Sequence, residues 1–171
     1  MITVYGQYYR FFTPMFLHVG VLHLLVNSFS LNAVGPQVES MFGSERTAVT
    51  YLLAGVAGNV ASFLLSPSAS SVGASGAIFG LVGALGVFLW RHEELLGAGS
   101  RAGLNSILQT CALNLMIGLI PGSQIDNWGH IGGAIGGAAV AFLIGPNFKM
   151  QRSLMGNKLV DEPLVPLPFA R

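Results

Sequence analysis

Long stretches without charged residues alternate with short charged segments along most of this chain. The charge-free stretches cover residues 11–38, 47–90, 102–125 and 127–148. A membrane-spanning helix needs about 20 largely apolar residues, so the second stretch is long enough for two spans. Ser66, Pro67 and Ser68 fall where the turn between them is needed. We therefore predict five spans, at about 15–36, 47–65, 75–91, 102–120 and 127–146.

The spans define the predicted fold class. Backbone polar groups in lipid must be bonded within their own segment, which favours helices. The prediction is an all-α membrane protein, a polytopic helical bundle of about five transmembrane helices, with one membrane domain over residues 1–146. Residues 147–171 are more polar and contain Pro163, Pro166 and Pro168, so we expect a flexible C-terminal tail there.

Composition and charge support a membrane location. Hydrophobic residues make up 52% of the chain and charged residues 9%, whereas soluble domains carry about 25% charged residues. The net charge of +1 gives no indication of a nucleic-acid partner. With five spans, one side of the membrane has a single basic residue, Arg10. The other side has the basic residues Arg46, Arg91, Arg101, Lys149, Arg152, Lys158 and Arg171. The positive-inside rule places that basic side in the cytoplasm or an equivalent compartment, such as a plastid stroma.

A few polar side chains fall inside the predicted spans. They are His18, His23 and Asn27 in the first span, Ser75 at the start of the third and His130 near the start of the fifth. Such residues are costly in lipid and are functional hypotheses by default. A helix rises 1.5 Å per residue, which places Asn27, Ser75 and His130 in the same leaflet, on the sparsely charged side. Three spans thus bring an amide, a hydroxyl and an imidazole to similar depths.

Glycines indicate how two of these spans meet. The third span contains Gly76, Gly80, Gly83 and Gly86, and the fifth contains Gly132, Gly133, Gly136 and Gly137. Small residues allow close approach of helix backbones in lipid. Positions 130, 133 and 137 share one helical face, as do 75, 79, 83 and 86. If these faces pack together, Ser75 and His130 lie at the same end of the contact, as an activated nucleophile requires.

Each of these residues also has a simpler explanation. A membrane serine usually bonds back to its own helix, a histidine can join two helices, and the glycines can serve packing alone. A metal site of His18, His23 and His130 is conceivable, but the first two are five residues apart and no carboxylate accompanies them. We predict no metal and no cofactor. Cys111 is expected to be a packing residue, and His92, beside a charged loop, is expected to be solvated.

Three short motifs follow one another along the predicted spans. They are His18-x4-His23-x3-Asn27, Gly73-Ala74-Ser75-Gly76, and Gly129-His130 followed by a glycine-rich helix. With this order and spacing, the sequence resembles the rhomboid family of intramembrane serine proteases, from about Tyr9 to Pro146. Tyr9-Arg10 stands where the family usually has Trp-Arg, and Glu39 stands where the family often has a buried glutamate.

The resemblance implies roles for particular residues. Ser75 would be the nucleophile and His130 the base of a Ser-His dyad without an acid. Asn27, His23 and the backbone amide of Ser75 would stabilise the oxyanion. Phe79 stands where the family often has a tyrosine packed on the histidine ring. The remaining motif residues would support the site: His18, Gly73, Gly76 and Gly133.

The resemblance also implies a function and a difference from the family. The family core has six spans with the serine on the fourth, whereas here Ser75 lies on the third of five, so the first core helix is absent from this chain. The expected function is a serine endopeptidase that cleaves transmembrane-anchored substrates in the lipid bilayer. The alternatives are a catalytically inactive relative that binds membrane clients, and a transporter or channel, which the lack of charged residues inside the spans disfavours. A bacterial inner membrane and a plastid or other organelle membrane both fit.

Overall fold

Helices and one β-hairpin make up most of the chain in a computed structural model that describes residues 2–66, 71–153 and 156–168. Two short 3-10 turns, Tyr8–Phe11 and Thr13–Phe16, come first. The α-helices in the described residues are α1 (Gly20–Phe42), α2 (Ser44–Leu65), α3 (Ser75–Arg91), α4 (Glu93–Leu96), α5 (Ala98–Gly118) and α6 (Asn127–Ile144). The strands β1 (Phe148–Ser153) and β2 (Gly156–Asp161) follow α6.

The five long helices lie where the five spans were predicted. The main difference is at α1, which begins at Gly20 because the 3-10 turn with Pro14 precedes it, and which continues to Phe42. His18 therefore lies before the helix, not within it. By length and composition α2 and α6 could each cross a membrane, and α3 is a shorter apolar helix of 17 residues. The helical fold class is confirmed, and the count of five spans stays a prediction.

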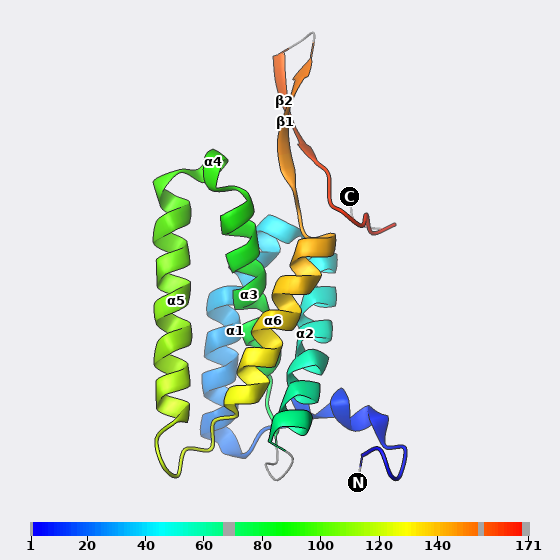
Figure 1. Cartoon of the computed structure of the whole chain (residues 1–171), viewed down its shortest axis with the longest axis vertical. Coiled ribbons are helices and arrows are strands. Elements are labelled where there is room, and N and C mark those ends of the chain that lie inside the picture. The colour runs from blue at the N-terminus through cyan, green and yellow to red at the C-terminus, as the bar shows by residue number, and fades with distance from the viewer. Residues whose placement is uncertain (1, 67–70, 154–155, 169–171) are drawn as a thin grey trace.

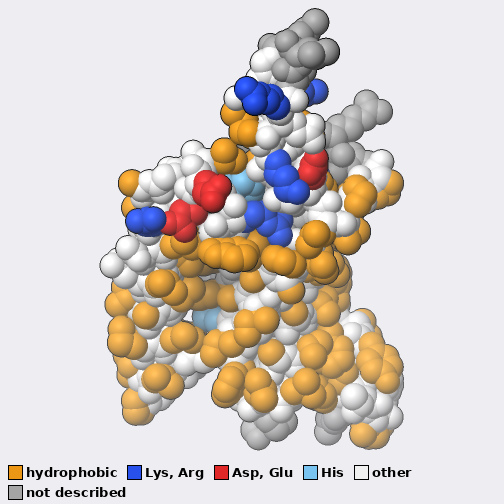
Figure 2. Space-filling view, turned by 45° about the horizontal axis from the view of Figure 1, so that its top comes forward, with side chains coloured by type: hydrophobic (Ala, Val, Ile, Leu, Met, Phe, Trp, Pro, Cys, Tyr) orange, Lys and Arg blue, Asp and Glu red, His pale blue; other side chains and the backbone are white. Residues whose placement is uncertain are grey.

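Helix α3 is the centre of the bundle. It contacts α1, α2, α5 and α6, whereas α5 lies at the outside and packs mainly on α3 (Figure 1). Apolar side chains cover the sides of the bundle in Figure 2, and Lys, Arg, Asp and Glu side chains gather at one end. That end is where α3 and α6 finish and where the hairpin begins (Figure 1). An apolar belt below a charged end is the distribution that lipid and an aqueous compartment would favour.

The segment expected to be a flexible tail contains the two strands of a hairpin. Strands β1 and β2 pair antiparallel, with Phe148 opposite Asp161 at the base and Ser153 opposite Gly156. The Asp161 carboxylate forms an ion pair with the buried Arg46 of α2 at 2.6 Å and accepts the Asn147 backbone N–H at 2.8 Å. Contacts with residues distant in sequence thus fix this part of the tail.

His92 holds the other side of the hairpin base and is buried, so the prediction that it is solvated is wrong. Its Nε2 accepts the backbone N–H of Phe148 at 2.8 Å, and its Nδ1 lies 2.8 Å from the Phe88 carbonyl oxygen. The neutral ring with its proton on Nδ1 satisfies both bonds. Protonation of Nε2 would place an N–H against the N–H of Phe148.

The first testable prediction concerns this bond. Burial lowers the pKa of His92, as does Arg91, while the Phe88 carbonyl and Asp161 act in the opposite direction. Because the unfolded chain then binds the proton more readily, the stabilisation is complete above about pH 6.5 and is lost as the pH falls toward the folded-state pKa. We expect the hydrogen-exchange protection factor of the Phe148 amide to be constant above about pH 6.5 and to fall as the pH is lowered below that value.

His92→Gln is the control, because glutamine does not titrate in this range. The protection factor of the Phe148 amide in this variant should not depend on pH, whatever its absolute value. Equal pH dependence in the parent and in His92→Gln would show that His92 does not control the attachment of the hairpin.

Candidate active site

Ser75 is the first residue of α3, at the end of the bundle opposite the hairpin. Ala74 precedes it and provides no side-chain cap, so within the described residues the first turn receives no capping bond from its N-cap residue. Gly73 before it has a φ of +121°, which glycine adopts without strain. The Gly73 N–H donates to the Pro14 carbonyl at 2.9 Å, which ties this loop to the 3-10 turn before α1. The loop therefore presents Ser75 at an uncapped helix start.

His23 and Asn27 lie beside this loop, one turn apart on α1. A Cβ atom added to Gly73 would lie 2.7 Å from both Cε1 and Nε2 of His23 and 3.8 Å from Nδ2 of Asn27. The Asn27 amide is buried and donates to the His23 carbonyl at 2.9 Å. His23 Nδ1 accepts the Val19 N–H at 3.4 Å, which leaves Nε2 to carry the ring proton. An imidazole N–H and a carboxamide thus border the start of α3.

His130 lies in the first turn of α6 and is 6% exposed. Its ring stacks on Phe79 of α3, with centroids 4.2 Å apart and planes 12° from parallel. Phe79 is one turn after Ser75, so the stack holds the imidazole against the first turns of α3. Among the described residues, Nδ1 of His130 is buried and has no hydrogen-bond partner. A buried polar atom without a partner is unusual and marks a candidate functional group.

Glycines bring α3 and α6 into backbone contact. A Cβ atom added to Gly133 would overlap the Gly76 carbonyl group, and one added to Gly137 would overlap the Gly80 carbonyl group. The closest backbone contacts of α3 with α6 are therefore at 76, 80 and 83; of the predicted face 75, 79, 83 and 86, Gly83 shares this contact and Phe79 meets α6 through its ring. Gly86 has no atom within 4 Å of its added Cβ and takes no part in the contact.

The structure thus brings most of the predicted site residues to one end of the α3–α6 contact. Ser75, Phe79 and His130 lie on the two helices, and His23 and Asn27 border the loop before Ser75. No hydrogen bond joins Ser75 to His130 in the described part of the chain, so the dyad stays a prediction.

His18 lies next to His23, with ring centroids 5.2 Å apart in an edge-to-face arrangement, and its buried Nε2 has no partner in the described residues. No group of three or more His, Cys, Asp or Glu side chains within residues 2–66, 71–153 and 156–168 is placed to hold a metal ion.

Asp126 is a structural residue of the site that the sequence analysis missed. It caps α6 by accepting the Gly129 N–H at 2.8 Å, and its carbonyl accepts the His130 N–H at 3.0 Å. An acidic residue immediately before an apolar helix is a recognised start signal, and the interval from Asp126 to Gly129 has the spacing of an N-cap bond. The cap fixes where α6 begins and therefore the position of His130 along the bundle axis.

Comparison with known proteins shows the family of the chain. The family model described as Rhomboid domain matches residues 5–147. The chain belongs to the rhomboid family. Rhomboid proteins are integral membrane proteins with a helical fold, and the matched region contains all five long helices.

Several curated rhomboid proteins are similar to the chain. Over 140 residues it is 43% identical to "Rhomboid protease GluP" of Bacillus subtilis, covering 82% of the chain and 27% of that protein. It is 37% identical to "RHOMBOID-like protein 1" of Arabidopsis thaliana, covering 83% of the chain and 36% of the relative. It is also 37% identical to "Inactive rhomboid protein 1" of Bos taurus, covering 82% of the chain and 16% of the relative. The chain thus spans well under two thirds of the length of these rhomboid relatives.

The second prediction concerns the glycine contact. Gly137→Ala should destabilise the bundle, because the new methyl group has no space beside the Gly80 carbonyl, and overpacking costs about 1–3 kcal/mol. The matched control is Gly86→Ala on α3, where the methyl group meets nothing within 4 Å. Thermal unfolding in detergent should show a lower midpoint for Gly137→Ala alone. Equal midpoints for the two variants would mean that α3 and α6 do not depend on this close approach.

Proposed function

We propose that this chain is the catalytic part of an intramembrane serine endopeptidase in which Ser75 is the nucleophile and His130 is the general base. The observation that carries the proposal is the buried imidazole of His130, stacked on Phe79 next to the first turn of α3, with Nδ1 unpaired among the described residues. The 43% identity to a protein named a rhomboid protease supports it.

The chemistry follows from these positions. Ser75 Oγ would attack the carbonyl carbon of a peptide bond while its proton moves to the His130 ring. The protonated His130 would then give that proton to the leaving amine, so that the peptide C–N bond breaks and an acyl-serine remains. Water, deprotonated by the same imidazole, would hydrolyse the acyl-serine and restore both side chains.

Three groups are suited to the developing oxyanion. The uncapped N-terminus of α3 offers backbone N–H groups, including that of Ser75, and helix N-termini favour negative charge. The Asn27 amide and the His23 imidazole border the loop before Ser75. Donors of this kind each contribute about 3 kcal/mol to transition-state binding in soluble proteases.

The substrates would be proteins anchored by a transmembrane segment, because Ser75 begins the apolar helix α3 within the bundle. We propose five membrane spans, formed by α1, α2, α3, α5 and α6, with the charged end of Figure 2 in the cytoplasm or its equivalent. The Ser75 end would then face the opposite compartment. A bacterial inner membrane and an organelle membrane are both compatible with this topology.

A second function is a rhomboid that binds membrane clients without cleaving them. The observation that favours it is the 37% identity to "Inactive rhomboid protein 1" of Bos taurus. The two functions differ in whether they require the hydroxyl group of Ser75. Recovery of a bound client should not change in Ser75→Ala if binding is the function, whereas cleavage requires the hydroxyl group.

The third prediction tests the nucleophile. In membranes containing the full chain and a single-span reporter, Ser75→Ala and His130→Ala should each reduce cleavage by about 10³-fold or more, because the two groups act as a unit. Ser106→Ala on the outer helix α5 is the matched control and should cleave at the parental rate. If Ser75→Ala cleaves the reporter as fast as the parent, the protease proposal is wrong.

The fourth prediction tests the oxyanion donors. Asn27→Ala should reduce cleavage by about 10²-fold and leave residual activity, because His23 and the α3 backbone amides remain. The rate constant of cleavage, measured at saturating reporter, should fall more than the apparent KM rises. A change in KM alone would place Asn27 in substrate binding and not at the oxyanion.

A further inference from the structure

Helix α5 stands at the outside of the bundle and packs mainly on α3 (Figure 1). Its inner face is well defined: Ser100 Oγ donates to the Leu89 carbonyl at 2.6 Å, and a Cβ atom added to Gly103 would lie 2.7 Å from Leu89 Cδ1. With 3.6 residues per turn, the side directly opposite is formed by exposed residues only. We call these residues the outer stripe: Ala98, Ala102, Asn105, Gln109, Ala112 and Met116.

The outer stripe is more polar than a surface in contact with lipid should be. Strongly polar side chains in membrane helices normally face the interior of their bundle, whereas Asn105 and Gln109 point away from it, one turn apart. A rise of 1.5 Å per residue puts both within about 5 Å of Leu108, the midpoint of α5. If α5 spans the membrane, as proposed above and as this inference requires, the two amides lie at the most apolar depth.

The two amides have no partner in the described part of the chain. Two other polar side chains of α5, Ser106 and Asn114, donate to backbone carbonyls one turn earlier, at 3.1 and 2.9 Å. Asn105 and Gln109 make no such bond within the described residues. A carboxamide without a partner is costly in an apolar medium, and in lipid such side chains bond across to another helix. The amides therefore require a partner from outside the described chain.

The partner that fits the outer stripe is a helix. Successive stripe residues are separated by 4, 3, 4, 3 and 4 positions, which is the alternation found in left-handed helix pairs. The alanines of the stripe allow the backbones of two helices to approach closely. Leu108 and Leu113, which are 66% and 55% exposed, flank the stripe and would enclose the amides from lipid.

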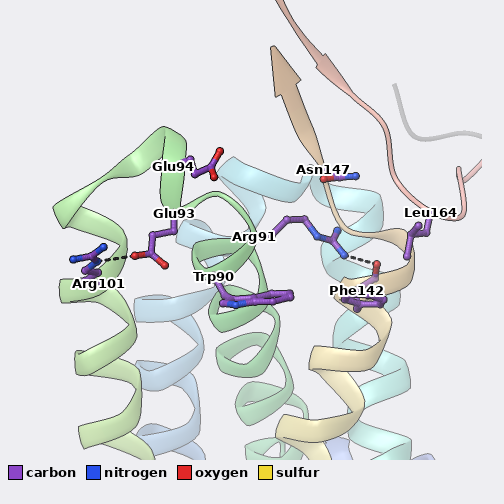
Figure 3. Close-up of a pocket in the computed structure, with 8 residues that line it drawn as sticks. All are labelled: Trp90, Arg91, Glu93, Glu94, Arg101, Phe142, Asn147 and Leu164. Atoms are coloured by element: carbon purple, nitrogen blue, oxygen red, sulfur yellow. Dashed lines mark hydrogen bonds and ion pairs between the residues drawn. The ribbon is translucent and has the colours of Figure 1, made fainter. Parts of the chain in front are cut away.

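The chemistry of the stripe favours the α5 helix of a second copy. A carboxamide is both donor and acceptor, so identical amides can bond to each other. Copies of one chain share one orientation in a membrane, so a twofold axis along the membrane normal makes the two helices parallel and places each stripe residue opposite its counterpart. Charge does not oppose the pairing, because Arg101 beside the stripe forms an ion pair with Glu93 at 2.6 Å (Figure 3).

We propose that this chain forms a parallel homodimer through the outer stripes of two α5 helices, with Asn105 and Gln109 hydrogen-bonded across the interface near the centre of the membrane. The interface faces away from α3, which carries Ser75. The proposal therefore concerns the association of copies and assigns no catalytic role to α5.

Disulfide crosslinking in the membranes of expressing cells tests the interface, because the copies there share one orientation. Cys111 is the only cysteine, so Cys111→Ser gives a background without thiols. Ala112→Cys is then introduced on the stripe, and Thr110→Cys is the control, exposed at nearly the same depth but outside the stripe. On mild oxidation Ala112→Cys should give a product of twice the chain's mass and Thr110→Cys should not, because a disulfide needs Cα atoms within about 7 Å.

Sedimentation equilibrium of the full chain in density-matched micelles measures the strength of the association. Asn105→Leu combined with Gln109→Leu should raise the dissociation constant by about tenfold, as expected for the loss of two interhelical hydrogen bonds. Thr110→Leu removes a polar group outside the stripe and should leave the constant unchanged. Leucine is more favourable than an amide in lipid, so weaker association of the double variant cannot be attributed to unfolding.

Several results would overturn the proposal. Equal crosslinking from positions 112 and 110, or none from either, would show that the stripe does not join copies. A disulfide from position 112 to another protein, in place of the doubled mass, would assign the stripe to a different helix. Unchanged or tighter association of the double leucine variant would contradict the role of the amides.

The membrane topology is tested separately. Labelling of Ala112→Cys by a membrane-impermeant maleimide before oxidation would show that α5 stands in water, where the amides need no partner, and would also overturn the proposal. No measurement here uses cleavage of a substrate. The dimer can therefore fail while the assignment of Ser75 stands, and the assignment of Ser75 can fail while the dimer stands.

Discussion

The backbone contact between α3 and α6 is the constraint on which the other features of the bundle depend. Helices in lipid gain little from the hydrophobic effect when they associate, so close van der Waals contact must hold them together. At Gly133 and Gly137 a single methyl group would already overlap the carbonyls of α3. The two helices can therefore approach only with this register, and the register determines which side chains meet at each end.

At one end the register places the His130 ring on Phe79, one turn from Ser75, while the Asp126 cap fixes where α6 starts. At the other end the same two helices bring Arg91 to the Phe142 carbonyl. One contact thus positions a candidate catalytic group at one end of the bundle and the Arg91–Phe142 hydrogen bond at the other. Helix α2 strengthens it, since a Cβ atom added to Gly58 would lie 2.6 Å from the Gly129 carbonyl oxygen.

The sequence predicted the long helices well because their signal is local: apolar stretches of about 20 residues separated by charges or turn residues. The contact face of α3 was predicted in part: Phe79 and Gly83 contact α6 as expected, but only the structure shows that the closest backbone contacts are at Gly76 and Gly80. Helix α1 begins later than predicted, at Gly20, because the 3-10 turn that contains Pro14 precedes it. His18 therefore lies outside the helix.

The hairpin could not be predicted in this way. Its strands are short and mostly polar, and its base depends on partners far away in sequence: Arg46 lies 115 residues before Asp161, and His92 lies 56 residues before Phe148. The roles of Ser75 and His130 also depend on a pairing between distant segments. The sequence predicted that these two residues lie at the same depth in the membrane. The structure brings their helices together, but no hydrogen bond joins Ser75 to His130 in the described residues.

The central claim is that His130 activates Ser75, and the most direct measurement is covalent labelling with a fluorophosphonate probe followed by peptide mass spectrometry. A serine hydroxyl reacts with such probes at a useful rate only when a base assists it. The account predicts one adduct on the full chain in detergent, on Ser75, and its loss in His130→Ala while the fold is retained. Labelling of Ser75 at the same rate in the parent and in His130→Ala, or no labelling of Ser75 in the folded parent, would contradict it.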